Sequence, residues 1–295
     1  MAQMAETSYY RFDDIEDELA TAQEGRRALF KAPDFTDKLK QRLDELLDGG
    51  RVLSLDVFDT LILRDNSSEI TRFFEVGGRM ADVVEAETGR QVSQVDAFIA
   101  RQLGTEATYR ASRPIQGCRE GSIVELHRTA SQLLVGSNDL AEAFIAAELE
   151  NEATRIGLNT FIVDYVASYR ASGGAVVLVT DMYLHAEQVV KLLEQLGIAR
   201  ESYDALFSSA DTKVSKSSGG IFPFVERNLV RSPGDFVHLG DSFRGDVAQP
   251  LRRGWKAMHL PLSEFDVRER QRDHRMTQAM LAKNHGFEVG ISMPR

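Results

Sequence analysis

The chain has 295 residues, of which 27% are charged and 43% apolar, and its net charge at pH 7 is −10. This length and composition indicate a folded protein, with one large domain carrying an insertion or two smaller domains, and exclude a disordered chain. The negative charge argues against binding to a nucleic-acid backbone, which needs an excess of Lys and Arg, but it permits a small phosphorylated substrate.

The sequence shows no sign of a membrane or secreted protein. Met1 to Asp14 contains no apolar run of the signal-peptide type, and no stretch approaches the ~18–20 apolar residues that span a bilayer. The single cysteine, Cys118, cannot form an internal disulfide or a cysteine-based zinc cluster. We therefore expect a cytoplasmic protein without membrane contact, and the sequence does not indicate its oligomeric state.

Residues 1–50 are predicted to form an N-terminal helical extension. This segment has 12 acidic residues against 7 basic ones, a charge that we attribute to solvated surface. Its apolar residues recur at helical spacing up to a helix-terminating glycine pair: Leu39, Leu43, Leu46 and Leu47, then Gly49 and Gly50.

Five short apolar runs after Gly50 are typical of buried strands. They cover residues 52–56, 175–180, 204–208, 235–240 and 256–260. Amphipathic helical segments follow two of them, at residues 186–196 and 221–229. Strands that alternate with helices predict a parallel, Rossmann-like sheet with helices on both faces.

Between Leu63 and Leu158 the sequence shows helical patterns and no convincing strand. The apolar positions share helical faces: Phe73, Val76, Met80 and Val83 in one segment, and Leu140, Phe144 and Ala147 in another. We expect an inserted helical lid over residues 71–155, and a core made of residues 51–70 and 156–261. Residues 262–295 are predicted to be an Arg-rich tail, part helix and part loop.

The most informative strand end is that of residues 52–61 (VLSLDVFDTL), where the apolar run reaches Asp56. A carboxylate in this place lies at the carboxyl edge of a parallel sheet, where ligands bind in open α/β folds. Such an aspartate can attack an electrophile and carry a covalent intermediate. Taken alone, a turn or helix-capping aspartate explains the pattern equally well.

Two further strand or helix ends carry groups suited to phosphate. Thr180 ends the run 176–180, and its hydroxyl could donate to a phosphate oxygen. Lys216 precedes the helix predicted from residue 221, where a cation can neutralise a bound anion. Lys213 is a rival three residues away, and we prefer Lys216 because its spacing suits that helix.

The run 236–246 (FVHLGDSFRGD) ends in two carboxylates, Asp241 and Asp246, across a glycine-containing turn. Carboxylate oxygens are the ligands that Mg²⁺ prefers. We expect Asp241 to be the ligand and Asp246 to orient it or the lysine, although a solvated turn is the alternative. His238 is expected to pack inside the strand.

Taken together, the order Asp, Thr, Lys, Asp-Asp resembles the four motifs of the haloacid dehalogenase (HAD) superfamily, and the helical insertion looks like that superfamily's C1 cap. The resemblance covers residues 51–70 and 156–261. It implies that Asp56 is the nucleophile. It also implies phosphate binding by Thr180, Asp181, Lys216 and Ser242, and Mg²⁺ binding by Asp56, the Phe58 carbonyl, Asp241 and Asp246.

The sequence departs from the superfamily's phosphatases at Phe58, where they usually carry an aspartate that protonates the leaving group. General acid catalysis is typically worth ~10²–10⁴-fold, so Asp59, a water or a lid residue would have to substitute, or the leaving group would have to be a good one. The dehalogenases of the superfamily carry an aromatic residue at this position, but their fourth motif usually lacks the carboxylate that Asp241 supplies here.

Three functions therefore stay open. We favour a Mg²⁺-dependent phosphohydrolase that acts on a small phosphorylated metabolite. The alternatives are a non-catalytic phosphate-binding or regulatory protein and a metal-independent carbon–halogen hydrolase. The Phe-Asp-Thr-Leu variant also looks like a subgroup of HAD hydrolases associated with surface-glycan genes, which does not define a substrate. The lid would select the substrate. Its candidate anion-binding residues are Arg101, Arg110, Arg113 and Arg119, although we favour surface charge as the explanation of each.

Overall fold

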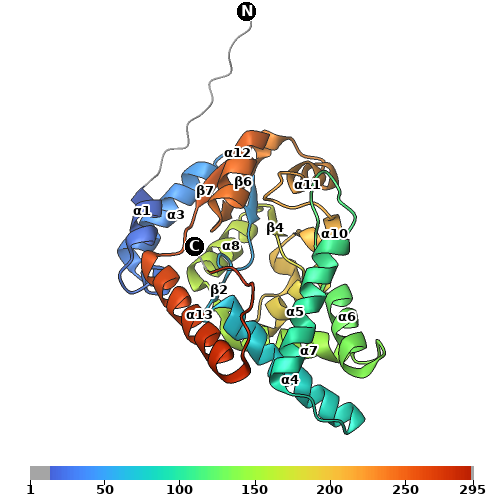
Figure 1. The fold of residues 1–295 in the computed structure, drawn as a ribbon. Coiled ribbons are helices and arrows are strands. Elements are labelled where there is room, and N and C mark those ends of the chain that lie inside the picture. The colour runs from blue at the N-terminus through green and yellow to red at the C-terminus, as the bar shows by residue number, and fades with distance from the viewer. Residues whose placement is uncertain (1–13, 294–295) are drawn as a thin grey trace, which may run out of the picture.

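The structure is a computed structural model in which residues 14–293 are described. At its centre lies a five-stranded sheet with the order β5-β4-β1-β6-β7 (Figure 1). All neighbouring strands are parallel. The strands are β1 (Val52–Leu55), β4 (Val176–Thr180), β5 (Ala205–Ser208), β6 (Phe236–Gly240) and β7 (Lys256–His259). Each falls within one of the five apolar runs, so the predicted Rossmann-like fold class is confirmed.

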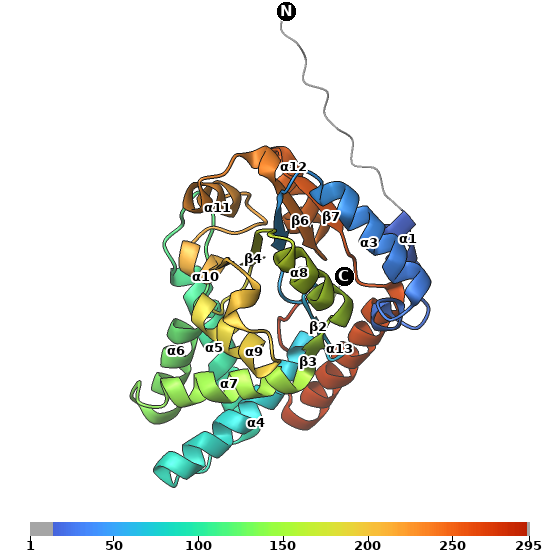
Figure 2. The same ribbon diagram turned by 180° about the vertical axis from the view of Figure 1, so that it is seen from behind.

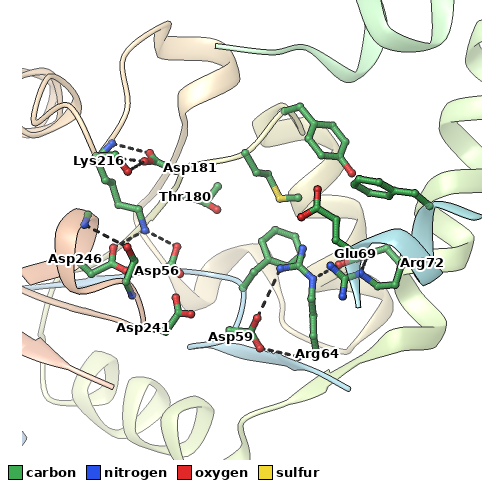
Figure 3. Close-up of a pocket in the computed structure, with 18 of the residues that line it drawn as sticks. Asp56, Asp59, Arg64, Glu69, Arg72, Thr180, Asp181, Lys216, Asp241 and Asp246 are labelled. Carbon is green, nitrogen blue, oxygen red and sulfur yellow. Dashed lines mark hydrogen bonds and ion pairs between the residues drawn. The ribbon is translucent and has the colours of Figure 1, made fainter. Parts of the chain in front are cut away.

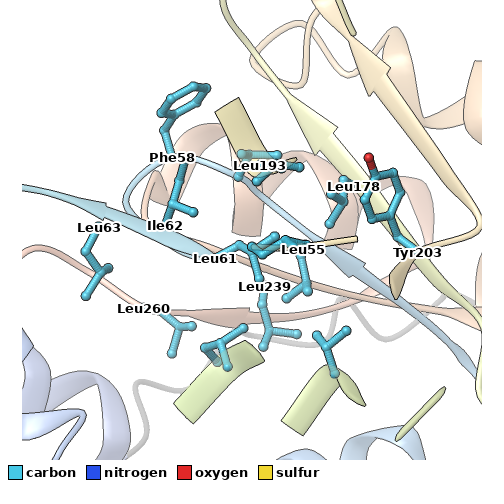
Figure 4. Packing of buried hydrophobic residues seen from close by; sticks show 14 of the residues in the cluster. Leu55, Phe58, Leu61, Ile62, Leu63, Leu178, Leu193, Tyr203, Leu239 and Leu260 are labelled. Atoms are coloured by element: carbon cyan, nitrogen blue, oxygen red, sulfur yellow. The ribbon is translucent and has the colours of Figure 1, made fainter. Parts of the chain in front are cut away.

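Alternate residues of the strands point to opposite faces of the sheet and pack against different helices. On one face, Leu55, Leu178 and Leu239 belong to a buried cluster that includes side chains of α3, α8 and α9 (Figure 4). On the other face, Val177 and Phe236 pack with side chains of α11. The bounds of these helices are α3 (Pro33–Leu47), α8 (Thr160–Ala171), α9 (Ala186–Gln195) and α11 (Ile221–Leu229). Burial on both faces explains why these strands are continuous apolar runs.

Short elements connect these layers. They are α10 (Ser209–Thr212), α12 (Gln249–Arg253), the 3₁₀ turns η1 (Arg200–Ser202) and η2 (Pro233–Asp235), and the π-helical turn η3 (Phe243–Ala248). Of these, η3 bears on the site, because it carries Asp246 directly after β6.

The N-terminal extension is helical over its described part and packs on the core. It consists of α1 (Asp14–Thr21), α2 (Arg26–Leu29) and α3. Leu39, Leu43 and Leu47 are buried against the sheet layer, as the helical spacing predicted. The part of the predicted extension before residue 14 lies outside the described residues.

Four helices form the insertion: α4 (Glu69–Thr88), α5 (Gln94–Ala111), α6 (Ile123–Val135) and α7 (Ala141–Arg155). They lie together beside the carboxyl ends of the core strands (Figures 1 and 2), and we call them the cap. The expectation of no strand between Leu63 and Leu158 was wrong at its two ends. There β2 (Ile62–Arg64) and β3 (Ile156–Leu158) pair antiparallel and join the cap to the core.

The C-terminal segment is more ordered than the composition suggested. Its helix α13 (Glu264–His285) runs for 22 residues and lies beside the N-terminal helices and α4 (Figure 1). Across residues 14–293, no helix is both long enough and apolar enough to cross a membrane.

Candidate active site

The sequence-predicted site residues meet at the carboxyl edge of the sheet. Asp56 follows β1, Thr180 ends β4 and Asp241 follows β6, and because these strands are parallel neighbours their ends lie together. All three line a pocket of about 420 Å³ that also contains Lys216 and Asp246 (Figure 3). This volume suits a small metabolite.

Lys216 is the centre of a buried chain of charges. Its Nζ lies 2.6 Å from Asp56 Oδ1 and 2.6 Å from Asp246 Oδ1. The rival Lys213 does not line this pocket. Behind Asp246, His238 Nε2 is 3.0 Å from Asp246 Oδ1, and its Nδ1 is 2.8 Å from Ser54 Oγ. The buried His238 therefore holds the Asp246 carboxylate in place, and that carboxylate in turn positions the Lys216 ammonium group.

The buried charges shift one another's ionisation. Burial raises the pKa of Asp56 well above its ordinary value, with Lys216 opposing this shift and the other carboxylates adding to it. Burial also raises the pKa of Asp241 to about 6, with a further contribution from Asp59. Despite its own burial, Asp246 has its pKa lowered, chiefly by Lys216 and His238. The site therefore has more carboxylate than its one lysine can balance.

A divalent cation could balance this excess of carboxylate charge. Asp56, Asp241 and Asp246 each offer a carboxylate oxygen, and these atoms lie within 4.8 Å of one another. Hard oxygen donors in such a cluster suit Mg²⁺. Because Asp246 already contacts Lys216 and His238, we expect Asp56 and Asp241 to bind the ion directly and Asp246 to support them.

The phosphate-binding candidates occupy different parts of the pocket. Thr180 and Ser242 both line it. The Ser242 hydroxyl, however, accepts the Gly245 N–H at 3.3 Å and so caps the turn after β6. The Asp181 carboxylate accepts the backbone N–H groups of Lys216 and Ser217 at 2.7 and 3.1 Å. Asp181 thus holds the loop that carries Lys216, rather than offering a donor to phosphate.

Asp59 does not replace the missing acid. Its carboxylate accepts hydrogen bonds from Arg26 Nη2 at 2.7 Å and from both Nη atoms of Arg270 at 2.8 and 3.0 Å. These arginines, with Arg64, hold the pKa of Asp59 far below its ordinary value, against the effect of burial. A carboxyl group in this state has no proton to donate, so the expectation of a catalytic Asp59 is corrected to a structural one.

The described structure also brings in two pocket residues that sequence reasoning missed, Arg64 and Arg72. Arg64 lies over the Phe58 ring, with its guanidinium carbon 4.2 Å from the ring centroid. Its Nε donates to Glu152 at 2.7 Å, and Arg72 Nε lies 3.8 Å from the same carboxylate. The only sequence signal for Arg64 was its position eight residues after Asp56, and it belonged to no motif.

The lid arginines named from the sequence do not line the pocket. Arg101 is fully buried and ion-paired with Glu148. Arg110 is exposed and Arg113 likewise, while Arg119 donates to the carbonyl groups of Arg110 and Ser112. Among the arginines of residues 14–293, those that line the pocket are Arg64 and Arg72.

Comparison with known proteins gives likenesses of fold. No family model matches the chain, and no curated protein matches it. Among solved structures it is similar to a 2-haloacid dehalogenase from Pseudomonas syringae pv. Tomato, at 16% identity over 71% of this chain and 85% of that one, with a TM-score of 0.49. It is also similar to L-2-haloacid dehalogenase from Xanthobacter autotrophicus. The identity is 15% over 78% of this chain and 87% of that one, with a TM-score of 0.46.

A third similar structure is that of a Bacillus subtilis protein described as a HAD-hydrolase and bound to magnesium. It is 18% identical over 70% of this chain and 86% of that one, with a TM-score of 0.43. At such identities and TM-scores, none of the three likenesses assigns an activity to this chain. The resemblance to the HAD superfamily rests instead on the order of the sequence motifs, whose residues Asp56, Thr180, Lys216, Asp241 and Asp246 line one pocket in the structure.

Proposed function

We propose that this protein is a Mg²⁺-dependent phosphohydrolase that acts through an aspartyl-phosphate on Asp56, with a small phosphorylated metabolite as its substrate. The observation that carries this proposal is the cluster of Asp56, Asp241 and Asp246, with oxygens within 4.8 Å of one another beside Lys216. A bound Mg²⁺ would supply positive charge to the three carboxylates and to the phosphate oxygens.

The protein's own groups account for the remaining chemistry. An Asp56 carboxylate oxygen attacks phosphorus, and the bond from phosphorus to the leaving-group oxygen breaks. Lys216 offsets the negative charge of the phosphoryl group, and the Thr180 hydroxyl can donate to one of its oxygens. Water then attacks the phosphorus of the aspartyl-phosphate, which releases inorganic phosphate and restores the Asp56 carboxylate.

A metal-independent carbon–halogen hydrolase would use the same nucleophile, and the aromatic Phe58 favours it. The charge balance of the site favours the phosphohydrolase. Without a cation, burial keeps the pKa of Asp56 and Asp241 raised, and a nucleophilic carboxylate must be ionised. A divalent ion would remove this obstacle, and it has no role in the dehalogenase alternative.

A panel of aryl, acyl and alkyl phosphates, with and without Mg²⁺, tests the proposal, together with halide release from 2-chloropropionate. We expect phosphate release that needs Mg²⁺. Halide release without metal would establish the dehalogenase instead. Binding of phosphate or Mg²⁺ without turnover of any compound would establish the regulatory alternative.

A further inference from the structure

We propose that the natural substrates are phosphoric anhydrides, in which the leaving group is itself a phosphate bound by Arg64 and Arg72. This inference rests on the proposed phosphohydrolase function and narrows its substrate class.

The two arginines are placed to meet a leaving group. Both line the same pocket as Asp56, on the side away from Lys216 and Asp246 (Figure 3). Their side chains are only 14% and 11% exposed, so they are held in place by packing. Arg64 rests on the ring of Phe58, two residues after the nucleophile, where the related phosphatases place their acid.

Arginines outnumber the carboxylates with which they pair at this wall of the pocket. Arg64 and Arg72 line the pocket, and two further arginines bind Asp59 from behind it. The four form ion pairs with only two carboxylates, Asp59 and Glu152, although the nearby Asp241 offsets part of the charge of Arg270. The four are Arg26, Arg64, Arg72 and Arg270.

The excess is concentrated on Arg72. Glu152 makes its close contact, at 2.7 Å, with Arg64, and Arg72 approaches it only to 3.8 Å. Burial lowers the pKa of Arg72, and the neighbouring charge of Arg64 lowers it further. Glu69 also lines the pocket, but it is exposed, so water screens its charge. A dianionic phosphate beside Arg64 and Arg72 would offset this excess, in the paired geometry that arginine makes with phosphate.

Cleavage of a phosphoric anhydride is consistent with the positive charge beside Arg64 and Arg72. An Asp56 oxygen bonds to the terminal phosphorus, and the bond from that phosphorus to the bridging oxygen breaks. The electron pair stays on the bridging oxygen, which leaves as part of a phosphate anion and needs no proton. Water then cleaves the aspartyl-phosphate to inorganic phosphate. An alkyl ester would instead leave as an alkoxide, which needs the acid that Phe58 and the ion-paired Asp59 cannot supply.

The test measures steady-state release of phosphate in the presence of Mg²⁺. The anhydride substrates are ADP and inorganic pyrophosphate. Glycerol phosphate serves as the alkyl ester, and p-nitrophenyl phosphate serves as the aryl reference. For the wild-type protein we expect kcat/KM for an anhydride to exceed that for glycerol phosphate by about 10²-fold or more. Arg72→Ala should lower the ratio of kcat/KM for ADP to that for p-nitrophenyl phosphate by about tenfold or more, and Arg72→Lys should retain part of it. The control is Arg110→Ala on the cap surface, where the side chain is 82% exposed and the ratio should not change.

The outcomes separate this inference from the function on which it rests. If glycerol phosphate is cleaved as well as the anhydrides, the inference is wrong, while Mg²⁺-dependent cleavage of p-nitrophenyl phosphate keeps the proposed function. A substrate ratio unchanged in Arg72→Ala also overturns it. The wild-type comparison needs no variant, so it decides the substrate class even if Arg72→Ala does not fold. If Mg²⁺ does not promote cleavage of any of the four compounds, both proposals fail.

Discussion

The expected effect of replacing Phe58 depends on Arg64, whose guanidinium lies over the Phe58 ring. The sequence alone suggests that Phe58→Asp would restore the missing acid and improve alkyl phosphate cleavage by up to ~10²–10⁴-fold. In the structure, the guanidinium carbon of Arg64 lies 4.2 Å from the centre of the Phe58 ring, so a carboxyl group at position 58 would have a cation beside it, and a neighbouring cation keeps a carboxyl group ionised. We therefore expect a gain in kcat/KM for glycerol phosphate well below that ceiling. A gain near 10⁴-fold, measured against p-nitrophenyl phosphate as reference, would show that Arg64 moves away.

Asp56 is expected to be essential for turnover. Asp56→Asn removes the anionic nucleophile but keeps the shape of the side chain and its contact with Lys216, so the fold should survive. We expect kcat to fall below detection, with the circular dichroism spectrum and the melting temperature close to those of the wild type. Near wild-type turnover of the best substrate would overturn the covalent mechanism.

Asp241 is expected to control Mg²⁺ binding. Asp241→Ala removes a direct ligand, so the Mg²⁺ concentration for half-maximal activity should rise by about tenfold or more, or activity should be lost. Titration calorimetry with Mg²⁺ alone gives a readout that does not depend on turnover. Exposed Asp139→Ala, on the cap, is the control. A crystal soaked in Mg²⁺ with the ion away from both Asp56 and Asp241 would contradict the assignment.

At the level of elements, the cap is joined to the core by a buried polar cluster centred on Glu148 of α7. Glu148 accepts hydrogen bonds from Arg101 Nε of α5 at 2.8 Å and from the Tyr183 hydroxyl, in the loop after β4, at 2.7 Å. His127 Nε2 of α6 lies 2.8 Å from it. The cluster thus ties three cap helices to the core loop next to Thr180.

Replacing Glu148 should destabilise the protein. Glu148→Gln leaves the buried guanidinium of Arg101 without its counter-charge, which typically costs about 3–5 kcal/mol of unfolding free energy. Glu150→Gln, in the same helix with a side chain 67% exposed, is the matched control and should cost about 0.5 kcal/mol or less. Urea unfolding at pH 7 measures both.

The cost of Glu148→Gln should also depend on pH. Arg101 and His127 lower the pKa of Glu148 in the folded protein, against the effect of burial. A carboxylate with a lowered folded-state pKa contributes stability that is present above its unfolded pKa, about 4.3, and is lost as pH falls below it. The stability difference between wild type and Glu148→Gln should therefore be constant from pH 7 to about 5 and shrink in more acidic solution. A difference that grows in acid would contradict the ion pair.

The elements themselves were largely predictable from the sequence, because each buried strand is a continuous apolar run and helices such as α3 and α4 have an apolar face. The exception is α13, whose buried side chains are mostly polar: Asp266, Arg270, His274, Thr277 and Leu281. The pair β2 and β3 was missed because each strand has only three residues and β3 is half-buried, which leaves too short a pattern to recognise. The strand-end motifs likewise located Asp56, Thr180, Lys216 and Asp241 in one pocket.

At the scale of the whole molecule, both the N-terminal helices and α13 reach the loop that follows Asp56. Arg26 of α2 and Arg270 of α13 bind the same carboxylate, Asp59, which has a backbone φ of 59° in the left-handed region that favours glycine. Sequence reasoning could not find this cluster, since Arg270 lies 211 residues from Asp59 and many other arginines occur in the tail. Asp59 adopts this conformation without being glycine, and its charge binds arginines of both terminal segments.

Removing one anchor should therefore affect both stability and the active site. Arg270→Ala leaves Asp59 with a buried, partly balanced charge, and we expect a loss of about 2–5 kcal/mol of unfolding free energy. Because Asp59 lies three residues after Asp56, the same change should also lower kcat, and Arg270→Lys should restore part of it. Arg272→Ala, in the same helix with a side chain 70% exposed, should change neither quantity appreciably. Urea unfolding together with kcat and KM for p-nitrophenyl phosphate distinguishes the cases. If Arg270→Ala destabilises the protein while kcat stays at the wild-type value, α13 stabilises the fold without positioning the nucleophile loop, and its contact with Asp59 has no catalytic consequence.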